Sequence, residues 1–575
     1  MGHKKTIIDF KGLQRRLIFT NPIQELIAET ISDVKSVLAQ VEKYQKKGYF
    51  VVGYLSYEAS KAFESRYQVK KHRLLTEKLA YFTVHDSYQE SMFPLSYDTV
   101  EVEGDWKACI SESDYQRAIS KVKTYIRNGD TYQVNFTFHM ENEVTISPQL
   151  LYERMVVEQE ALYNAYIETD DFTVLSFSPE LFFEKTNCQI ITKPMKGTVK
   201  RGVTLEEDLN KKIWLSKDTK NRAENMMIVD LLRNDMSRIS KVGSVKVKKL
   251  CEVEQYSTVW QMTSTIESVL EDHKNLIDIF EALYPCGSIT GAPKISTMSI
   301  IDEVENMPRG VYCGSIGICF PNGDLIFNVA IRTIQLSDNR AIYGVGGGIT
   351  WYSDWEDEYE ETKAKSQILY RKQPKFSIIT TGRIENAQLL DKERHYKRLV
   401  ESCRYFNFPL QKEVLDDKLN EKLNSLDRDE SYKIRISVFK SGNIECAIEK
   451  LKQLPQSYLL PILKERKLLE DSPFYYFKTS NRLHIPYTNG DIIFYSENGV
   501  LQESRIGNLV LEIDGSLYTP KLIRGCLNGI YRQKLLEEKT IIEKTLTLKD
   551  LQKADKTFIC NAVRGMYEVE WSNHD

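Results

Sequence analysis

A carboxylate lies on the apolar face of a predicted helix in the first half of the sequence. Within Arg222–Asp235, Glu224 shares one helical face with the apolar residues at positions 227, 228 and 231. A carboxylate in such a place is costly to bury alone. Glu224 therefore either lies at the rim of the helix beside a cation or belongs to a binding site, and this segment alone leaves both interpretations open.

A second predicted helix, Asp357–Lys365, carries Glu358, Glu361 and Lys365 on one face. A solvated helix is the ordinary explanation for so many charges. This helix, however, follows a glycine-rich loop at 344–348, where a ligand can approach the backbone closely. Isoleucine after that loop excludes the dinucleotide-binding pattern. The segment therefore favours a magnesium ion, held by carboxylates, that binds an anionic small molecule.

Two lysines lie in sequence segments that could position a nucleophile. Lys196 comes directly before a glycine turn, although a surface turn would explain it equally well. Lys478 follows the aromatic run Pro473–Phe477, and a desolvated lysine has a lowered pKa and can form a Schiff base. The segment Pro285–Lys294 adds a hydroxyl-rich turn that opens a helix, where backbone amides can hold an anion.

The elements that must position these groups alternate between strand and helix patterns. Short apolar, β-branched or aromatic segments predict strands at 49–55, 172–177, 325–334 and 341–345. Helical periodicity covers 114–128, 222–232 and 358–370. The predicted fold class is therefore mixed α and β (α+β). A helix-stopping proline in the basic stretch 371–375 indicates a boundary near 371, so we expect an amino-terminal segment 1–105, a domain 106–370 and a domain 371–575.

Composition excludes several classes of protein. With 575 residues, 42% of them hydrophobic and 28% charged, the chain has the composition of a multidomain globular protein. A net charge of -3 gives no positive field for nucleic acid or a membrane surface, and no apolar run could span a bilayer. Ten cysteines without paired spacing and a start without a signal-peptide pattern predict a cytoplasmic protein with reduced thiols.

The first 370 residues resemble the chorismate-utilising enzymes. The matching stretches, in order, are GYLSYEA, SPELFF, KPMKGTVKRG, RAENMMIVDLLRND, PCGSITGAPK, RGVYCGSIG, FNVAIRT, GVGGGI and SDWEDEYEETKAK. The resemblance implies a chorismate-binding domain with a two-layered sheet and flanking helices. It implies Mg²⁺ binding by Glu224, Glu358 and Glu361. It implies chorismate binding by Gly197, Thr198, Ser288, Tyr312, Arg332, Gly348 and Lys365.

Lys196 indicates which branch of that family the sequence resembles. Relatives that make anthranilate carry alanine in this position, whereas the branch that makes aminodeoxychorismate carries lysine. The resemblance implies that Lys196 attacks ring carbon 2, that the 4-hydroxyl leaves with magnesium assistance, and that ammonia then enters at carbon 4 and expels the lysine. Two residues depart from the family pattern: Gln261 replaces a histidine of many relatives, and Asn221 replaces a glutamate of the anthranilate enzymes.

The source of ammonia is not evident in this sequence. A glutaminase needs a cysteine on a G-x-C-x-G elbow, and the nearest stretch, Gly317–Pro321, has proline in place of the second glycine. We therefore expect a separate glutamine amidotransferase (glutaminase) partner.

The second half resembles the fold-type IV pyridoxal-phosphate enzymes, closest to the aminodeoxychorismate lyases. The stretches are ERHYKRLVES, FKTSNR, LQESRIGNLV and TPKLIRGCLNGIYRQ. The resemblance implies that Lys478 forms the aldimine with pyridoxal 5'-phosphate and that Glu503 pairs with the pyridine nitrogen. The phosphate would be held by Arg398, Ile530, Tyr531, Asn561 and Ala562.

Together the two resemblances imply a bifunctional enzyme of folate precursor synthesis. Chorismate and ammonia would give 4-amino-4-deoxychorismate, and elimination of pyruvate would then give 4-aminobenzoate. The alternatives are an aminodeoxychorismate or anthranilate synthase fused to a D-amino-acid or branched-chain aminotransferase-like domain, and an inert protein that only binds chorismate or the glutaminase. Because fold-type IV enzymes are commonly dimers, the resemblance also allows a homodimer through the second half.

Overall fold

The computed structural model describes residues 4–97, 105–170, 172–370, 372, 374–467, 472–522 and 525–572. The chain divides into two compact units. The first contains Met1–Lys200 and Lys212–Lys372, and the second contains Arg201–Lys211 and Gln373–Asp575. Helix α4 (Leu205–Lys217) therefore starts in one unit and ends in the other. None of the helices in the described ranges has the length and apolar content needed to cross a bilayer.

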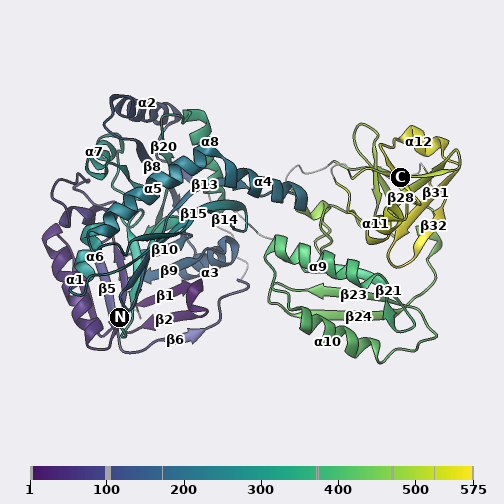
Figure 1. The fold of residues 1–575 in the computed structure, drawn as a ribbon, viewed down its shortest axis with the longest axis horizontal. Helices are drawn as coiled ribbons and strands as arrows, with labels where there is room; N and C mark the ends of the chain where they lie inside the picture. The colour runs from purple at the N-terminus through teal and green to yellow at the C-terminus, as the bar shows by residue number, and fades with distance from the viewer. Residues whose placement is uncertain are drawn as a thin grey trace. The chain divides into compact units, whose positions relative to one another are not determined.

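Two antiparallel sheets form the first unit (Figure 1). The first sheet contains, in spatial order, β16 (Gly291–Ala292), β8 (Gln133–Glu143), β20 (Arg340–Ile349), β19 (Thr333–Ser337), β10 (Thr173–Ser178), β9 (Tyr163–Glu168), β1 (Lys5–Phe10), β2 (Arg16–Thr20) and β6 (Gln89–Ser91), with β7 (Lys107–Ala108) beside β8. The second contains β13 (Met195–Lys200), β15 (Val259–Val269), β12 (Gln189–Lys193), β11 (Leu181–Thr186), β18 (Leu325–Val329), β17 (Ser315–Cys319), β4 (Phe50–Leu55), β5 (Ala80–His85) and β3 (Gln24–Ala28), with β14 (Lys246–Gln255) beside β15.

Alternation along the strands explains the stacking of these two sheets. In β4, Val52 and Tyr54 join a core that includes Ile8 of the other sheet, whereas Val51 and Leu55 point to the opposite face. That outer face packs against α1 (Ile31–Lys46), α5 (Thr219–Ser237) and α6 (Leu276–Leu283). The outer face of the first sheet packs against α2 (Glu112–Asn128), α3 (Pro148–Gln159), α7 (Lys294–Val304) and α8 (Trp355–Ser366). The expected two-layered sheet with flanking helices is confirmed.

The segment 325–334, expected as one strand, forms two strands in different sheets. β18 ends at Val329 in the second sheet, and β19 begins at Thr333 in the first. Between them Arg332 adopts φ 52°, a left-handed conformation that redirects the chain. The prediction was wrong because the residues on both sides of the crossing are apolar, so the pattern shows no break.

The glycine run 344–348 was expected to be a loop, but it lies inside β20. Its residues pair with β8, from Gly344 opposite His139 to Gly348 opposite Asn135. A Cβ on Gly346 would lie only 2.3 Å from the Phe136 carbonyl oxygen, so glycine is needed for this close approach.

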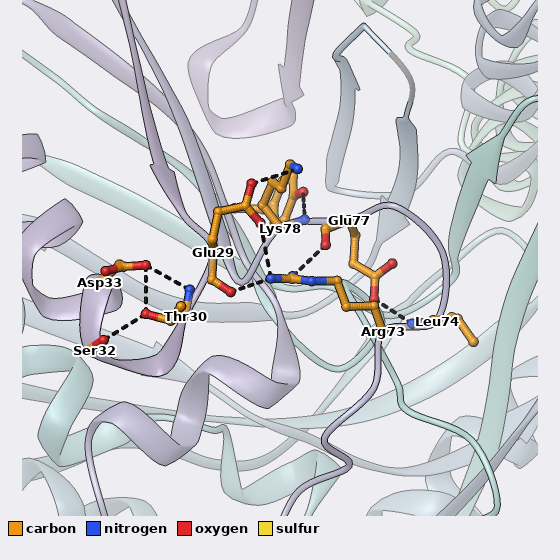
Figure 2. Close-up of polar contacts among 9 residues, drawn as sticks. Glu29, Thr30, Ser32, Asp33, Arg73, Leu74, Glu77 and Lys78 are labelled. Carbon is orange, nitrogen blue, oxygen red and sulfur yellow. Dashed lines mark hydrogen bonds and ion pairs between the residues drawn. The ribbon is translucent and has the colours of Figure 1, made fainter.

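A charged cluster fixes the connection that precedes β5 in the first unit. Figure 2 shows Arg73 reaching toward Glu29, with a side-chain separation of 3.4 Å, and donating to the Glu77 carbonyl at 2.6 Å. Lys78 pairs with Glu29 at 2.8 Å, and the Glu77 carboxylate accepts the Leu74 amide at 2.9 Å. These contacts involve none of the predicted site residues, so their role is structural.

In the described part of the second unit there are three sheets. The first contains, in spatial order, β22 (Gln388–Leu389), β21 (Ile378–Glu385), β23 (Tyr432–Val438) and β24 (Ile444–Lys450). The second contains β25 (Ile462–Glu465), β26 (Ile492–Tyr495) and β27 (Leu501–Ser504). The third contains β30 (Ile542–Lys544), β29 (Ser516–Pro520), β28 (Asn508–Ile513), β31 (Lys556–Asn561) and β32 (Gly565–Val569). Helices α9 (Lys392–Phe406) and α10 (Lys412–Leu423) share a core with the first of these sheets. Helices α11 (Ile530–Glu537) and α12 (Leu548–Lys553) pack on opposite faces of the third, against Val510 and Leu509 respectively.

The second unit also holds the short segment Arg201–Lys211 through specific contacts. Arg201 pairs with Asp208 through two hydrogen bonds of 2.6 and 2.7 Å. Its guanidinium carbon lies 4.6 Å from the ring centre of Tyr405 on α9, and the Tyr405 hydroxyl donates to the Gly202 carbonyl at 2.6 Å. The ion pair stabilises the segment internally, and the two contacts of Tyr405 fix it on α9.

Candidate active sites

Lys196 lies on β13, the strand that ends the second sheet. The Asn225 side chain donates to the Lys196 carbonyl at 3.3 Å, and the Gln261 side chain donates to the Gly197 carbonyl at 2.8 Å. Gly197 has φ +93°, and a Cβ on it would lie 3.0 Å from Asn221. Gly197 lies at a bulge within β13 and not in the expected turn, and its backbone conformation requires glycine.

Gln261 has a structural role at this bulge. Besides its bond to Gly197, its side-chain oxygen accepts the Thr198 hydroxyl at 2.8 Å. The residue that departs from the family's histidine thus fixes the backbone that follows Lys196.

The glycines of β20 bring Lys196 together with two predicted residues of α8. A Cβ on Gly348 would lie 2.9 Å from the Lys196 Nζ. A Cβ on Gly347 would lie 3.1 Å from the Glu358 Oε2 and 3.7 Å from the Lys365 Nζ. Lys196, Glu358 and Lys365 therefore lie around one short stretch of β20, where the glycines let their polar groups approach the backbone closely.

The three carboxylates of the predicted magnesium site act on one another. Burial raises the pKa of Glu224 and of Glu358, and the charge of Glu361 raises both further. Glu361 is paired with Lys365 at 2.7 Å, which lowers the pKa of Glu361. Among the residues that the structure describes, no three histidine, cysteine, aspartate or glutamate side chains are grouped as a metal site. The oxygen donors suit Mg²⁺ chemically, and Lys365 would compete with it for Glu361.

Glu180, directly before β11, is a residue that the sequence analysis missed. It is 3% exposed, and one of its carboxylate oxygens lacks a hydrogen-bond partner among the described residues. Burial raises the pKa of Glu180 to about 7, although a hydrogen bond from Ser288 and the charge of Lys196 oppose the rise. A carboxyl group that gains and loses a proton near neutral pH can act as an acid or base. A single glutamate beside an apolar strand gave no spacing signal for this role.

Burial also lowers the pKa of Lys196 itself, because desolvation disfavours the charged ammonium group. The charges of Glu224, Glu180 and Glu361 oppose that shift, and the charge of Lys365 adds to it. A lysine with a lowered pKa is suited to act as a nucleophile, and Lys196 lies among carboxylates.

The remaining predicted chorismate-binding residues lie around β20 and the start of α7. Ser288 is buried in the turn Gly287–Ile289, and Tyr312 packs flat on Gly344 of β20, where a Cβ would lie 2.2 Å from its ring. Arg332 makes no ion pair with any residue of the described ranges, and burial lowers the pKa of Arg332. An unneutralised guanidinium group is suited to a carboxylate ligand.

Lys478 lies where the FKTSNR stretch pairs with β21. Its carbonyl accepts the Ile379 amide at 2.9 Å. Burial lowers the pKa of Lys478 to about 7, and the positive charges of Arg398, Arg482 and Arg435 contribute. Near neutral pH much of this lysine is uncharged, which is the form that makes a Schiff base.

Glu503 is held at both of its carboxylate oxygens. Oε1 lies 3.3 Å from the Arg466 Nη1, and Oε2 accepts the Leu527 amide at 2.8 Å. Burial raises the pKa of Glu503, and Arg466 opposes this. Arg466 is itself buried and also donates to Gln502 at 2.9 Å. The sequence analysis missed Arg466, because a lone arginine after a short strand carries no motif.

The predicted phosphate-binding residues lie around the start of α11. Arg398 donates to the Asn528 carbonyl at 2.7 Å, one residue before the helix cap, and Ile530 and Tyr531 open the helix. The Asn561 side chain accepts two amides in the turn that contains Ala562, at 3.0 and 2.9 Å. A cation, a helix start and a tight turn suit a phosphate group. Together with Lys478 and Glu503, these residues fit pyridoxal phosphate.

Comparisons with known proteins match two families, one after the other along the chain. Residues 3–371 match the family described as chorismate binding enzyme, and residues 377–570 match the family described as amino-transferase class IV. "Aminodeoxychorismate synthase component 1" of Bacillus subtilis is 39% identical over 271 residues, which are 47% of this chain and 58% of that protein. "Anthranilate synthase component 1" of Aquifex aeolicus is 35% identical over 277 residues, 48% of this chain and 56% of that protein. The chain thus spans about half the length of these curated relatives.

A solved structure supports the fold of the first unit. Anthranilate synthase component I from Streptococcus pneumoniae aligns with a TM-score of 0.56 and 26% identity, over 64% of this chain and 92% of that one.

Proposed function

Because the chain belongs to the family of chorismate-binding enzymes and carries a class IV aminotransferase domain, we propose that it makes 4-aminobenzoate from chorismate in two steps. The first unit forms 4-amino-4-deoxychorismate from chorismate and ammonia. The second unit eliminates pyruvate from that compound. The observation that carries the proposal is the position of Lys196, whose amine lies beside the glycines of β20 and the carboxylates of α5 and α8.

In the first step, Arg332 and Lys365 bind the carboxylates of chorismate. The uncharged Lys196 amine forms a bond to ring carbon 2, and the bond from carbon 4 to its hydroxyl oxygen breaks. Glu180, with its pKa near 7, gives a proton to the leaving hydroxyl and takes one from the alkylated lysine. Ammonia then bonds to carbon 4, the bond between carbon 2 and the Lys196 nitrogen breaks, and a proton lost by the added ammonium group restores the lysine amine.

Mg²⁺ held by Glu224, Glu358 and Glu361 would supply positive charge that stabilises the anionic substrate and the departing oxygen. A glutaminase partner would supply the ammonia. Purified chain should therefore use ammonium salts but use glutamine only after that partner is added.

In the second step, pyridoxal phosphate would supply the electron sink. Glu503, beside Arg466, would pair with the ring nitrogen, and Arg398 with the start of α11 would hold the phosphate. The Lys478 amine, with its pKa near 7, would remove the proton from the ring carbon that carries the amine. The bond between ring carbon 3 and the enol ether oxygen then breaks, the ring becomes aromatic, and the released enolpyruvate takes up a proton to become pyruvate.

Product identification tests both steps. Cofactor-free protein with chorismate, ammonium and Mg²⁺ should accumulate aminodeoxychorismate, and added pyridoxal phosphate should convert it to 4-aminobenzoate and pyruvate in equal amounts. Anthranilate as the first product would refute the assignment of Lys196. Transfer of the amino group to a 2-oxo acid, without pyruvate release, would make the second unit an aminotransferase.

A further inference from the structure

Two side-chain amides bind the backbone of the β-bulge that contains Lys196. The register of β13 against β15 shifts by one residue here, so that Lys196 and Gly197 together lie opposite Met262. The Lys196 carbonyl accepts the Asn225 side chain at 3.3 Å. The Gly197 carbonyl accepts the Gln261 side chain at 2.8 Å. The backbone of the proposed nucleophile is therefore held by residues of two other elements, α5 and β15.

Asn225 is fixed in the orientation that places its donor toward Lys196. It is 1% exposed. The Ser264 hydroxyl accepts the Cys251 amide at 2.9 Å, and it donates its own proton to the Asn225 Oδ1 at 2.5 Å. Since Oδ1 is occupied in this way, the Nδ2 group of Asn225 faces the Lys196 carbonyl.

A second bulge, in β14, begins this chain of hydrogen bonds. Leu250 and Cys251 together lie opposite Ser264 of β15. Cys251 adopts φ 54°, a left-handed conformation that a residue with a side chain adopts only at a cost. In this conformation the buried Cys251 amide reaches the Ser264 hydroxyl. Backbone strain of this kind is often found where the surrounding structure must position a functional group.

Asn225 also connects Lys196 to the predicted magnesium site. It directly follows Glu224 on α5. The charge of Glu224 acts on the Lys196 amine, while the Asn225 amide binds the Lys196 carbonyl. An asparagine that served stability alone could bind any carbonyl group. This one binds the carbonyl of the proposed nucleophile, and one turn of α5 therefore sets the position of a proposed metal ligand and of the lysine together.

We propose that Asn225 is a positioning residue for Lys196. Its amide fixes the lysine backbone so that the amine points to the substrate, and Ser264 and Cys251 hold Asn225 in place. The inference rests on the proposed function, in which Lys196 is the nucleophile of the first step, and adds the residue that orients it. Orientation matters because a displacement of about 1 Å at the reacting atoms can cost about 100-fold in rate.

The kinetic test compares Asn225→Leu with Asn164→Leu in the full chain. Leucine has the branched shape of asparagine but forms no side-chain hydrogen bond. Asn225→Leu should lower kcat for chorismate consumption by about 10- to 100-fold and leave KM for chorismate and for Mg²⁺ within about threefold, because the orientation of the amine and not substrate binding is lost. Asn164 is equally buried and binds the Ala161 carbonyl at 3.1 Å, so Asn164→Leu loses a comparable hydrogen bond and should keep kcat. An unchanged kcat in Asn225→Leu, or a rise in KM alone, would overturn the proposal.

Ser264→Ala tests the chain of hydrogen bonds while Asn225 is still present, and it decides the question if Asn225→Leu does not fold. It should lower kcat by about three- to tenfold with KM unchanged. Added to Asn225→Leu, it should cause no further loss of kcat, since Ser264 acts through Asn225. An unchanged kcat in Ser264→Ala, or losses that multiply in the double variant, would contradict the proposal.

Crystal structures of the wild type and Asn225→Leu separate this proposal from the proposed function. The Lys196 amine should move by about 1 Å or more in the variant, with Glu224 in its original position. If the wild type makes no aminodeoxychorismate but the amine moves in the variant, the proposed function fails and the positioning role stands. A Lys196 amine that keeps its wild-type position would refute the role even if the synthase is active.

Discussion

The two units place a desolvated lysine in surroundings of opposite charge. Burial lowers the pKa of both Lys196 and Lys478. Around Lys196 the main charges are carboxylates, among them Glu224, whereas around Lys478 they are arginines. Desolvation thus prepares both amines for reaction, and the sign of the neighbouring charge indicates the missing ligand: a cation with its substrate in the first unit, and anions in the second.

The largest effect should come from removing the lysine of the arginine-rich site. Lys478→Ala should lose the visible band of the cofactor–lysine bond and reduce 4-aminobenzoate formation by about 1,000-fold or more, because the nucleophile and the proton carrier are lost together. Aminodeoxychorismate should accumulate from chorismate at the normal rate. Borohydride trapping of the cofactor on another lysine would contradict the assignment.

The carboxylate-rich site should be almost as sensitive. Glu361→Ala should reduce chorismate consumption by about 100- to 1,000-fold, since it removes a proposed magnesium ligand, and leave processing of supplied aminodeoxychorismate unchanged. Glu360→Ala is the matched control, because Glu360 is the residue next to Glu361 on α8 and pairs with Lys363 at 2.6 Å. Normal chorismate turnover in Glu361→Ala would refute the metal assignment.

A single methyl group should affect one site and spare the other. Gly348→Ala would place a Cβ 2.9 Å from the Lys196 Nζ, and displacing that amine should slow the first step by about 10- to 100-fold. Gly12→Ala, where a Cβ meets nothing within 4 Å, should have no effect. Steady-state rates of chorismate consumption decide the comparison, and the cofactor band of the second unit should be unchanged in both variants.

The smallest effect concerns the charge around Lys478. Because the pKa of Lys478 is about 7, the rate at which cofactor-free protein binds pyridoxal phosphate covalently should rise with pH through about 7 and then level off. Arg435→Met removes a positive charge that disfavours the ammonium form, so the midpoint should move to higher pH. Absorbance after rapid mixing measures it, and a midpoint that moves to lower pH would show that the arginine acts on another group.

Local sequence patterns predicted the strands and helices better than the points where the chain passes from one sheet to the other. The strand expected at 49–55 is β4, and the helix expected at 114–128 is α2, because each has one buried face that repeats with its own period. The redirection at Arg332 could not be predicted, since it depends on which sheet each strand joins.

The same limit applies to the candidate sites. The shared face of Glu358 and Lys365 follows from helical spacing, and the structure places both beside Gly347. Glu180 and Arg466 were missed because burial and a distant partner determine their properties, and neither is visible in local sequence.

The segment Arg201–Lys211 has a consequence for any attempt to separate the two activities. A gene cut near residue 372 would yield a carboxy-terminal fragment without these eleven residues, which the second unit includes through the contacts of Arg201 and Tyr405. The amino-terminal fragment would keep them, but without their ring contact. Co-expression of the two fragments, or a carboxy-terminal fragment with residues 201–211 grafted onto it, is therefore the sounder design than independent expression of each half.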